Sequence, residues 1–353
     1  MASPPYLGPG ACDNGSGGGE WTLAGDAHRE ALVDVRIVVL GAGAMGSLMA
    51  GRLALAGADV VLLGRPSPHL ASIAAAGLTL TEDDGSSQKI PLPVTTEPDA
   101  VEEIDLLVVL VKSWATAEAL ASIHDRLPVS ATVLTLQNGL GNVAAIRAAL
   151  GDDTPPRDVV IGVTAQAARR EAPGTVRHTG DGPTAIGRPD GLTTPRLSAA
   201  AAAFVSAGFA TVVVPDIERW VWRKLAVNAA INGPTALAGV PNGAIRSNPE
   251  LRAAAIILAA EVAAIARARG IKLDHIAAAV DKVAQDTALN RSSMLQDFDT
   301  QERTEVDAIY GLLIAESERL GIGVPASRVV AALIRAHEQA VNAEGQEDRE
   351  RDA

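Results

Sequence analysis

The chain has 353 residues, 48% of them apolar, which is long enough for two ordinary domains and rules out a disordered protein. Its formal net charge is −12. This charge argues against nucleic acid or an anionic membrane as a partner, because either would need a broad basic surface.

Cysteine content and apolar runs indicate the compartment. The single cysteine, Cys12, forms neither an internal disulfide nor, alone, a zinc site, so we expect a reducing, cytoplasmic setting and no metal. No apolar run reaches the roughly 18 residues of a membrane span. The first residues also lack a basic region followed by an apolar core. We therefore expect a protein that is neither secreted nor embedded in a membrane.

The first part of the chain has the pattern of an α/β domain. Residues 1–33 are rich in Gly, Pro and Ser, which predicts a flexible leader. From 34 to 215, short runs of Val, Ile and Leu alternate with helical stretches, as in a doubly wound parallel sheet buried on both faces. The runs are RIVVL, DVVLLG, DLLVVLV, ATVLTL, DVVIGVTA and ATVVV.

The second part of the chain has helical patterns instead of strand signals. From 216 to 342 these patterns predict helices at 217–239, 250–269, 273–288, 298–320 and 326–342. Residues 343–353 are nearly all charged or polar and predict a flexible tail. The predicted fold class is therefore α/β, with an N-terminal Rossmann-type parallel-sheet domain followed by an all-helical C-terminal domain.

A glycine-rich turn follows the first predicted strand and opens a helix. In a G-x-G-x-x-G turn the first glycine permits the tight turn, the second lets a pyrophosphate approach, and the third lets helix and strand pack closely. The amides that begin the helix then face the phosphates. The alternative is a turn that serves packing only. The sequence predicts a dinucleotide site formed by Gly41, Ala42, Gly43, Ala44, Met45 and Gly46.

The end of the second predicted strand indicates which dinucleotide binds. An Asp or Glu there would accept hydrogen bonds from the ribose of NAD, but the chain has Gly64 and Arg65 instead. A 2′-phosphate would find a cation at Arg65, which predicts NADPH/NADP+ as the cofactor. The alternative is a solvated surface arginine. His69, shortly after it, is predicted to be a solvated helix residue.

Two further strand ends carry polar residues. Lys112 follows the run DLLVVLV, and Gln137 with Asn138 follows ATVLTL. Ligands of open α/β sheets gather at the carboxyl ends of strands. We therefore expect these residues to face one crevice, although a lysine that ends a strand is often merely solvated.

The helix predicted at 217–239 carries a polar stripe. Lys224, Asn228 and Asn232 are spaced four apart and share one helix face among Leu, Ala, Val and Ile. Asn is a poor residue for a helix interior. The stripe therefore favours a ligand-facing surface, with a solvent-facing stripe as the alternative. Hydride reduction of a ketone forms an alkoxide that a lysine ammonium can protonate.

Ser293 and Glu305 stand twelve residues apart, about 120° out of register on one uninterrupted helix. Either the helix begins after Ser292 and Ser293 or the chain bends between them and Glu305. Their spacing alone favours a helix-capping serine and a solvated glutamate.

The motifs together resemble the ketopantoate reductase (2-dehydropantoate 2-reductase) family over about Val35 to Val341. The most specific segments are WRKLAVNAAINGPTAL, PNGAIR and SSMLQDFDTQERTEVDAIYG. The resemblance implies Lys224 as the general acid and Glu305 as the acid that organises it. It implies substrate contacts for Asn228, Asn232, Asn242 and Ser293, and cofactor contacts for Arg65, Lys112 and Asn138.

The expected function is therefore NADPH-dependent reduction of 2-dehydropantoate to pantoate, as in pantothenate biosynthesis. One alternative is a reductase or dehydrogenase of another branched or aromatic 2-keto acid. Another is a cofactor-binding protein without turnover, which would have no chemical need for Lys224, Asn228, Ser293 and Glu305. The expected partner is a small 2-keto acid, with the chain as a monomer or homodimer.

Overall fold

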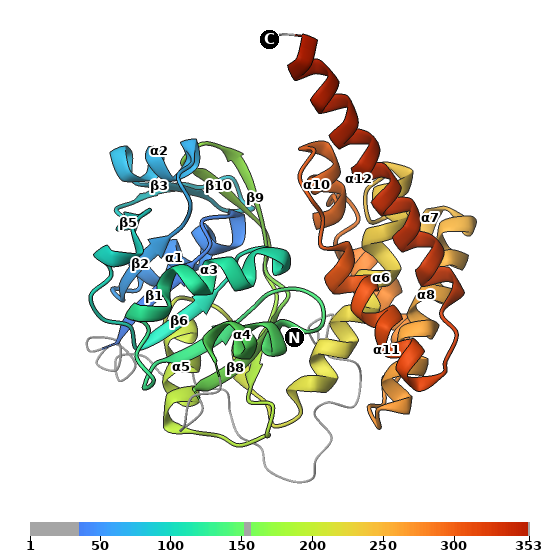
Figure 1. Cartoon of the computed structure of the whole chain (residues 1–353), viewed down its shortest axis with the longest axis horizontal. Coiled ribbons are helices and arrows are strands. Elements are labelled where there is room, and N and C mark those ends of the chain that lie inside the picture. Colours follow the sequence, from blue (N-terminus) through green and yellow to red (C-terminus); the bar gives the residue numbers. More distant parts are fainter. Residues whose placement is uncertain (1–34, 152–156, 352–353) are drawn as a thin grey trace. The chain divides into compact units, whose positions relative to one another are not determined.

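The computed structural model describes residues 35–151 and 157–351, so the leader predicted at 1–33 lies outside the described residues. Two compact units make up the fold (Figure 1). The first, here called the sheet unit, extends to Ile217; the second, the helical unit, begins at Glu218. The loop Asn138–Gly141 is the exception, because its contacts assign it to the helical unit.

An eight-stranded sheet forms the centre of the sheet unit, in the order β12-β11-β8-β7-β6-β1-β2-β5. All six predicted strands are confirmed, and they pair in parallel wherever they are neighbours. They are β1 (Arg36–Leu40), β2 (Asp59–Leu63), β6 (Leu106–Val109), β7 (Thr132–Thr135), β8 (Asp158–Thr164) and β12 (Thr211–Val213). The short strands β5 (Val94–Thr95) and β11 (Thr184–Gly187) complete the sheet, and β11 runs antiparallel to β8.

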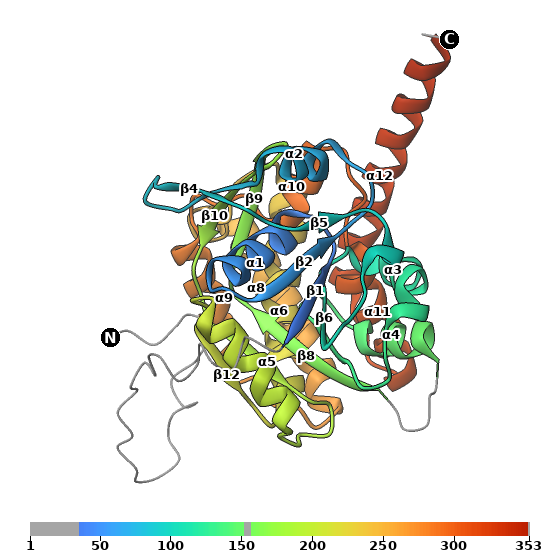
Figure 2. The same cartoon turned by 90° about the vertical axis from the view of Figure 1, so that its left-hand side faces the viewer.

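Helices cover both faces of this sheet, as the unbroken apolar strands predict. Ile37 and Val39 of β1 face the core under α1 and α5, whereas Val38 and Leu40 face the core under α3 and α4. Figure 2 shows α3 and α4 on one side of β1 and β6, and α1 on the other. The helices are α1 (Ala44–Leu55), α2 (Pro68–Ala76), α3 (Thr116–Ile123), α4 (Asn142–Leu150) and α5 (Pro195–Ser206). Short 3₁₀ turns lie at Pro98–Ala100, Ser113–Ala115 and His124–Arg126.

A second sheet of four strands, in the order β4-β3-β10-β9, was not predicted from the sequence. Its strands are β3 (Leu78–Thr81), β4 (Ser87–Ile90), β9 (Ala167–Ala172) and β10 (Thr175–Gly180). The outer strands are largely exposed: β9 reads AARREA and β4 reads SQKI. They lack the apolar run by which a doubly buried strand is recognised.

The helical unit contains only helices and connecting turns between Glu218 and Arg351, so the predicted fold class is confirmed. Its helices are α6 (Ile217–Ala238), α7 (Ala244–Ser247), α8 (Pro249–Ala268), α9 (Ile276–Asp286), α10 (Ser293–Asp299), α11 (Leu312–Leu320) and α12 (Pro325–Arg351). A π-helical segment, Asp307–Gly311, leads directly into α11.

Two features of the helical unit differ from the sequence prediction. The helix expected at 298–320 is interrupted: α10 ends at Asp299, and Gln301 adopts a left-handed φ of 56° that no α-helix continues through. Helix α12 continues to Arg351, through the segment for which the sequence predicts a flexible tail. Glu, Gln, Arg and Ala dominate that segment and are good helix formers.

Candidate active site

The glycine turn has the backbone geometry that its sequence predicts. Gly41 has a φ of 124°, and a Cβ there would lie 2.6 Å from the backbone nitrogen of Val111. A Cβ at Gly46 would collide with the carbonyl oxygen of Gly41. At Gly43, directly before α1, a Cβ would meet no heavy atom within 4 Å. The turn is therefore tight on its inner side and open where the amides of α1 begin.

Arg65 follows β2 next to this turn. Gly64 packs closely against Ala42, since a Cβ at Gly64 would lie 2.7 Å from the Ala42 Cβ. The Arg65 side chain is exposed and has no acidic partner within the described ranges. Its guanidinium is therefore available for an anion beside the glycine turn.

The prediction of a solvated His69 is wrong, because this residue is only 3% exposed. Its Nδ1 accepts a hydrogen bond from the Gly174 N–H at 3.0 Å, and its Nε2 lies 3.0 Å from Ser47 Oγ. Burial and the charge of Arg170 lower the pKa of His69. This histidine joins α1 and α2 to the turn between β9 and β10.

Hydrogen bonds connect the segments that follow β6 and β7 within the sheet unit. Gln137 Nε2 donates to the Val111 carbonyl and to Thr116 Oγ1, both at 2.8 Å. Lys112 is partly buried directly before the 3₁₀ turn at Ser113. Asn138, one residue after Gln137, belongs instead to the helical unit, where its Nδ2 donates to Glu305 Oε2 at 3.1 Å. This contact between Asn138 and Glu305 was not predicted from the sequence.

Lys224 and Glu305 form the charged centre of the helical unit. The Lys224 side chain on α6 is largely buried, and desolvation lowers its pKa to about 8 while the charge of Glu305 opposes that shift. Glu305 is only 8% exposed, so the interpretation as a solvated glutamate is wrong. The interruption at Gln301 removes the register problem that an unbroken helix would impose on Ser293 and Glu305.

Further polar side chains follow Lys224 along α6, and one of them contacts α10. Asn228 is partly buried one turn after Lys224. One turn further, Asn232 Nδ2 donates to Ser293 Oγ at 3.4 Å. The capping serine is Ser292, whose Oγ accepts from the Leu295 N–H. Ser293 itself is exposed, so its hydroxyl is accessible to a ligand.

Asn242 has one side-chain atom without a partner. Its Nδ2 donates to Thr287 Oγ1 at 3.0 Å, and its backbone N–H donates to the Asn290 carbonyl. Its Oδ1 is buried and accepts no hydrogen bond from the described residues. A buried carbonyl oxygen without a donor is costly, so this atom is suited to a ligand that brings a hydroxyl or amide.

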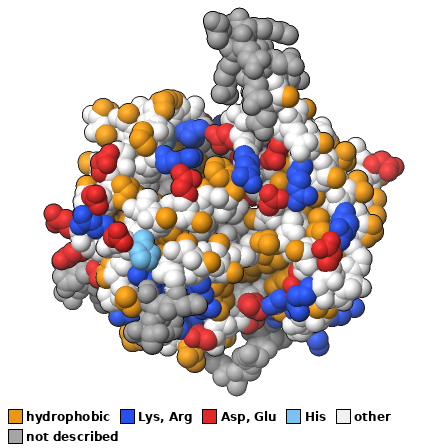
Figure 3. Space-filling view, viewed as in Figure 1, with side chains coloured by type: hydrophobic (Ala, Val, Ile, Leu, Met, Phe, Trp, Pro, Cys, Tyr) orange, Lys and Arg blue, Asp and Glu red, His pale blue; other side chains and the backbone are white. Residues whose placement is uncertain are grey.

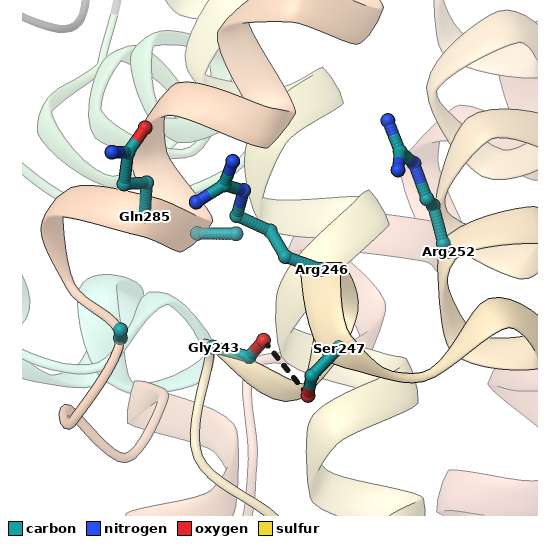
Figure 4. A pocket seen from close by; sticks show the side chains of 7 residues that line it. Gly243, Arg246, Ser247, Arg252 and Gln285 are labelled. Carbon is teal, nitrogen blue, oxygen red and sulfur yellow. Dashed lines mark hydrogen bonds between the residues drawn. The ribbon is translucent and has the colours of Figure 1, made fainter.

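A pocket of about 440 Å³ lies near Asn242 in the helical unit, but none of the predicted site residues lines it. In Figure 4 the Arg246 side chain extends toward Gln285, and the Ser247 hydroxyl donates to the Gly243 carbonyl. Arg246 also forms an ion pair with Asp281. The residues that line the pocket are Gly243, Arg246, Ser247, Arg252, Ala284, Gln285 and Ala288.

The described surface carries charges of both signs. Acidic and basic side chains are interspersed over the described part of the face drawn in Figure 3. The described residues contain no group of three His, Cys, Asp or Glu suited to a metal ion, and none of their helices is long and apolar enough to cross a membrane.

Family models match both units of the chain. The model described as "Ketopantoate reductase PanE/ApbA" matches residues 37–191, and its C-terminal counterpart matches residues 216–338. A 2-dehydropantoate 2-reductase of Halobacterium salinarum is 39% identical over 302 residues, which are 85% of this chain and 98% of that protein. The chain belongs to the ketopantoate reductase family. Another relative in this family, the 2-dehydropantoate 2-reductase of Archaeoglobus fulgidus, is 34% identical over 85% of this chain and 97% of its own.

Solved structures have the same fold as this chain. A PanE/ApbA family ketopantoate reductase from Ralstonia eutropha superposes with a TM-score of 0.79 at 33% identity, over 87% of this chain and 100% of its own. D-mandelate dehydrogenase with NADH and anilino(oxo)acetate superposes with a TM-score of 0.81 over the same shares. Its identity is 24%, so that likeness concerns the fold alone.

Proposed function

We propose that this chain catalyses the NADPH-dependent reduction of 2-dehydropantoate to pantoate. The observation that carries the proposal is a largely buried Lys224 whose positive charge is stabilised by Glu305, in a chain whose relatives are named 2-dehydropantoate 2-reductase. The enzyme is then an NADP-dependent oxidoreductase that acts on the CH–OH group of a small 2-hydroxy acid.

The residues of the sheet unit fit the cofactor. The open side of Gly43 leaves room for a pyrophosphate at the first amides of α1, and Arg65 has its guanidinium free for a 2′-phosphate. We assign to cofactor binding Asn138 of the helical unit and, in the sheet unit, Gly41, Ala42, Gly43, Ala44, Met45, Gly46, Arg65 and Lys112. When bound, NADPH supplies the hydride that reduces the keto carbon.

The residues of the helical unit supply the proton and hold the substrate. The ammonium of Lys224 protonates the oxygen of the former keto group as negative charge develops on it. The negative charge of Glu305 favours the charged form of that ammonium and so opposes the effect of its desolvation on the pKa. We assign Asn228, Asn232, Asn242 and Ser293 to the substrate, with Ser293 on its carboxylate and the unpaired Asn242 Oδ1 as an acceptor for a hydroxyl.

A comparison of substrates and cofactors tests this proposal. The purified chain is assayed with 2-dehydropantoate, a branched 2-keto acid and the aromatic phenylglyoxylate, each with NADPH and with NADH. We expect the highest kcat/KM for 2-dehydropantoate with NADPH. A higher value for another 2-keto acid would contradict the substrate, and cofactor binding without any turnover would indicate a non-catalytic protein. We further expect a cytoplasmic monomer or homodimer that binds no nucleic acid.

A further inference from the structure

The loop Asn138–Gly141, between β7 and α4, packs onto the π-helical segment Asp307–Gly311 of the helical unit. The Leu140 N–H donates to the Ala308 carbonyl oxygen at 3.0 Å. A π-helical turn shifts hydrogen bonding within a helix, and such turns occur frequently at functional sites. Here the turn presents a backbone oxygen to a loop that arrives from outside the helix.

Gly139 permits this close approach. Its φ is 83°, and a Cβ there would collide with the carbonyl oxygen of Ala308 and lie 2.6 Å from its carbonyl carbon and 2.7 Å from its Cβ. Two of these three atoms belong to backbone, which cannot rotate away. Any side chain at this position therefore has to push the loop off the π-helical segment.

Gly141, two residues later, provides a contrast in the same loop. Its φ is 80°, close to that of Gly139. A Cβ there would meet only the Leu312 side chain, first at Cδ1 at 2.5 Å. That atom is the end of a flexible side chain, so the contact is relieved by rotation while the loop stays in place.

Glu305 immediately precedes the same segment, and its carbonyl accepts from the Ile309 N–H. Its carboxylate accepts from Asn138 Nδ2, directly before Gly139 in the chain. We infer that Gly139 is a positioning residue: by letting the loop touch Ala308, it holds the Asn138 amide on Glu305 and thereby fixes the carboxylate that acts on Lys224. This inference rests on the proposed function for its kinetic consequences only.

The effect of Glu305 on Lys224 makes the inference measurable. Burial lowers the pKa of Lys224, and Glu305 is the charged group of the described residues that raises it. If the carboxylate turns away, desolvation acts unopposed and the ammonium loses its proton at lower pH. The titration of Lys224 therefore reports where the Glu305 carboxylate lies.

The test compares Gly139→Ala with Gly141→Ala, which share the backbone strain of a left-handed position. NMR of isotope-labelled lysine follows the titration, and a Lys224→Arg variant assigns its signal. Few signals compete, because the chain has five lysines: Lys89, Lys112, Lys224, Lys272 and Lys282. We expect the Lys224 midpoint of Gly139→Ala to lie about half a pH unit or more below that of Gly141→Ala.

Kinetics and a second variant complete the design. Gly139→Ala should lower kcat for 2-dehydropantoate about tenfold or more relative to Gly141→Ala. Asn138→Ala removes the amide without a backbone clash and should lower the Lys224 midpoint in the same direction, so it decides the question if Gly139→Ala does not fold. Equal Lys224 midpoints in wild type, the folded Gly139→Ala and Asn138→Ala would overturn the inference. A wild-type chain that reduces no 2-keto acid would instead contradict the proposed function, and the titration would still decide whether Gly139 positions Glu305.

Discussion

The pH dependence of turnover follows directly from the burial of Lys224. As the proton donor, Lys224 must carry its proton in the active enzyme, and its pKa is about 8. With that value roughly 90% of the chains are protonated at pH 7 but only about 10% at pH 9, whereas an ordinary lysine would remain almost fully protonated at both. We therefore expect kcat/KM for 2-dehydropantoate to fall about ninefold to tenfold between pH 7 and pH 9.

The assay follows NADPH absorbance at low 2-dehydropantoate concentration across this range, with the intact fold checked at each pH by circular dichroism. Glu305→Gln serves as the comparison: it keeps the size of the side chain but removes the charge that raises the Lys224 pKa, so its activity should fall at lower pH than that of the wild type. A wild-type profile that stays flat up to pH 9 would refute the assignment of Lys224 as a buried proton donor.

Three further predictions concern the cofactor, the substrate and stability. Arg65→Ala should raise the KM for NADPH far more than that for NADH, because only NADPH carries the 2′-phosphate; equal increases would contradict the assignment. Ser293→Ala should raise the KM for 2-dehydropantoate about tenfold and leave the melting temperature unchanged. Ser292→Ala removes the cap of α10 and should lower the unfolding free energy by about 1 kcal/mol. Thermal melts and steady-state kinetics of both variants distinguish the two roles. Tyr310→Phe removes the buried hydroxyl that donates to the Ala229 carbonyl at 2.6 Å and should lower the unfolding free energy in urea by about 1 kcal/mol; no loss would contradict that role.

The central strands were predictable because burial on both faces leaves a continuous apolar run in the sequence. Strand β1, RIVVL, is buried on both faces from Ile37 on, and helices cover each side of it. Strand β9, AARREA, has no apolar run, because four of its six residues are exposed. It forms a strand by pairing with β10. Its register depends on tertiary contacts that single-sequence patterns do not contain.

The candidate site could be predicted from the sequence where its residues share one helix. Lys224, Asn228 and Asn232 follow from a four-residue spacing on α6, but the position of Glu305 depends on the helix break near Gln301, which spacing alone does not reveal. The contact of Asn138 with Glu305 joins residues 167 positions apart. Gly139 was the available signal in the sequence, because a left-handed φ or a close backbone contact requires glycine.

Substitution of Lys224 tests the central claim most directly, because the proposed cofactor contacts lie outside α6. Lys224→Ala is measured for NADPH binding by fluorescence titration and for turnover with 2-dehydropantoate at saturating cofactor. General-acid assistance contributes about 10²- to 10⁴-fold, so turnover should fall by that order while the Kd for NADPH stays nearly unchanged. Near-normal turnover by Lys224→Ala would contradict the account.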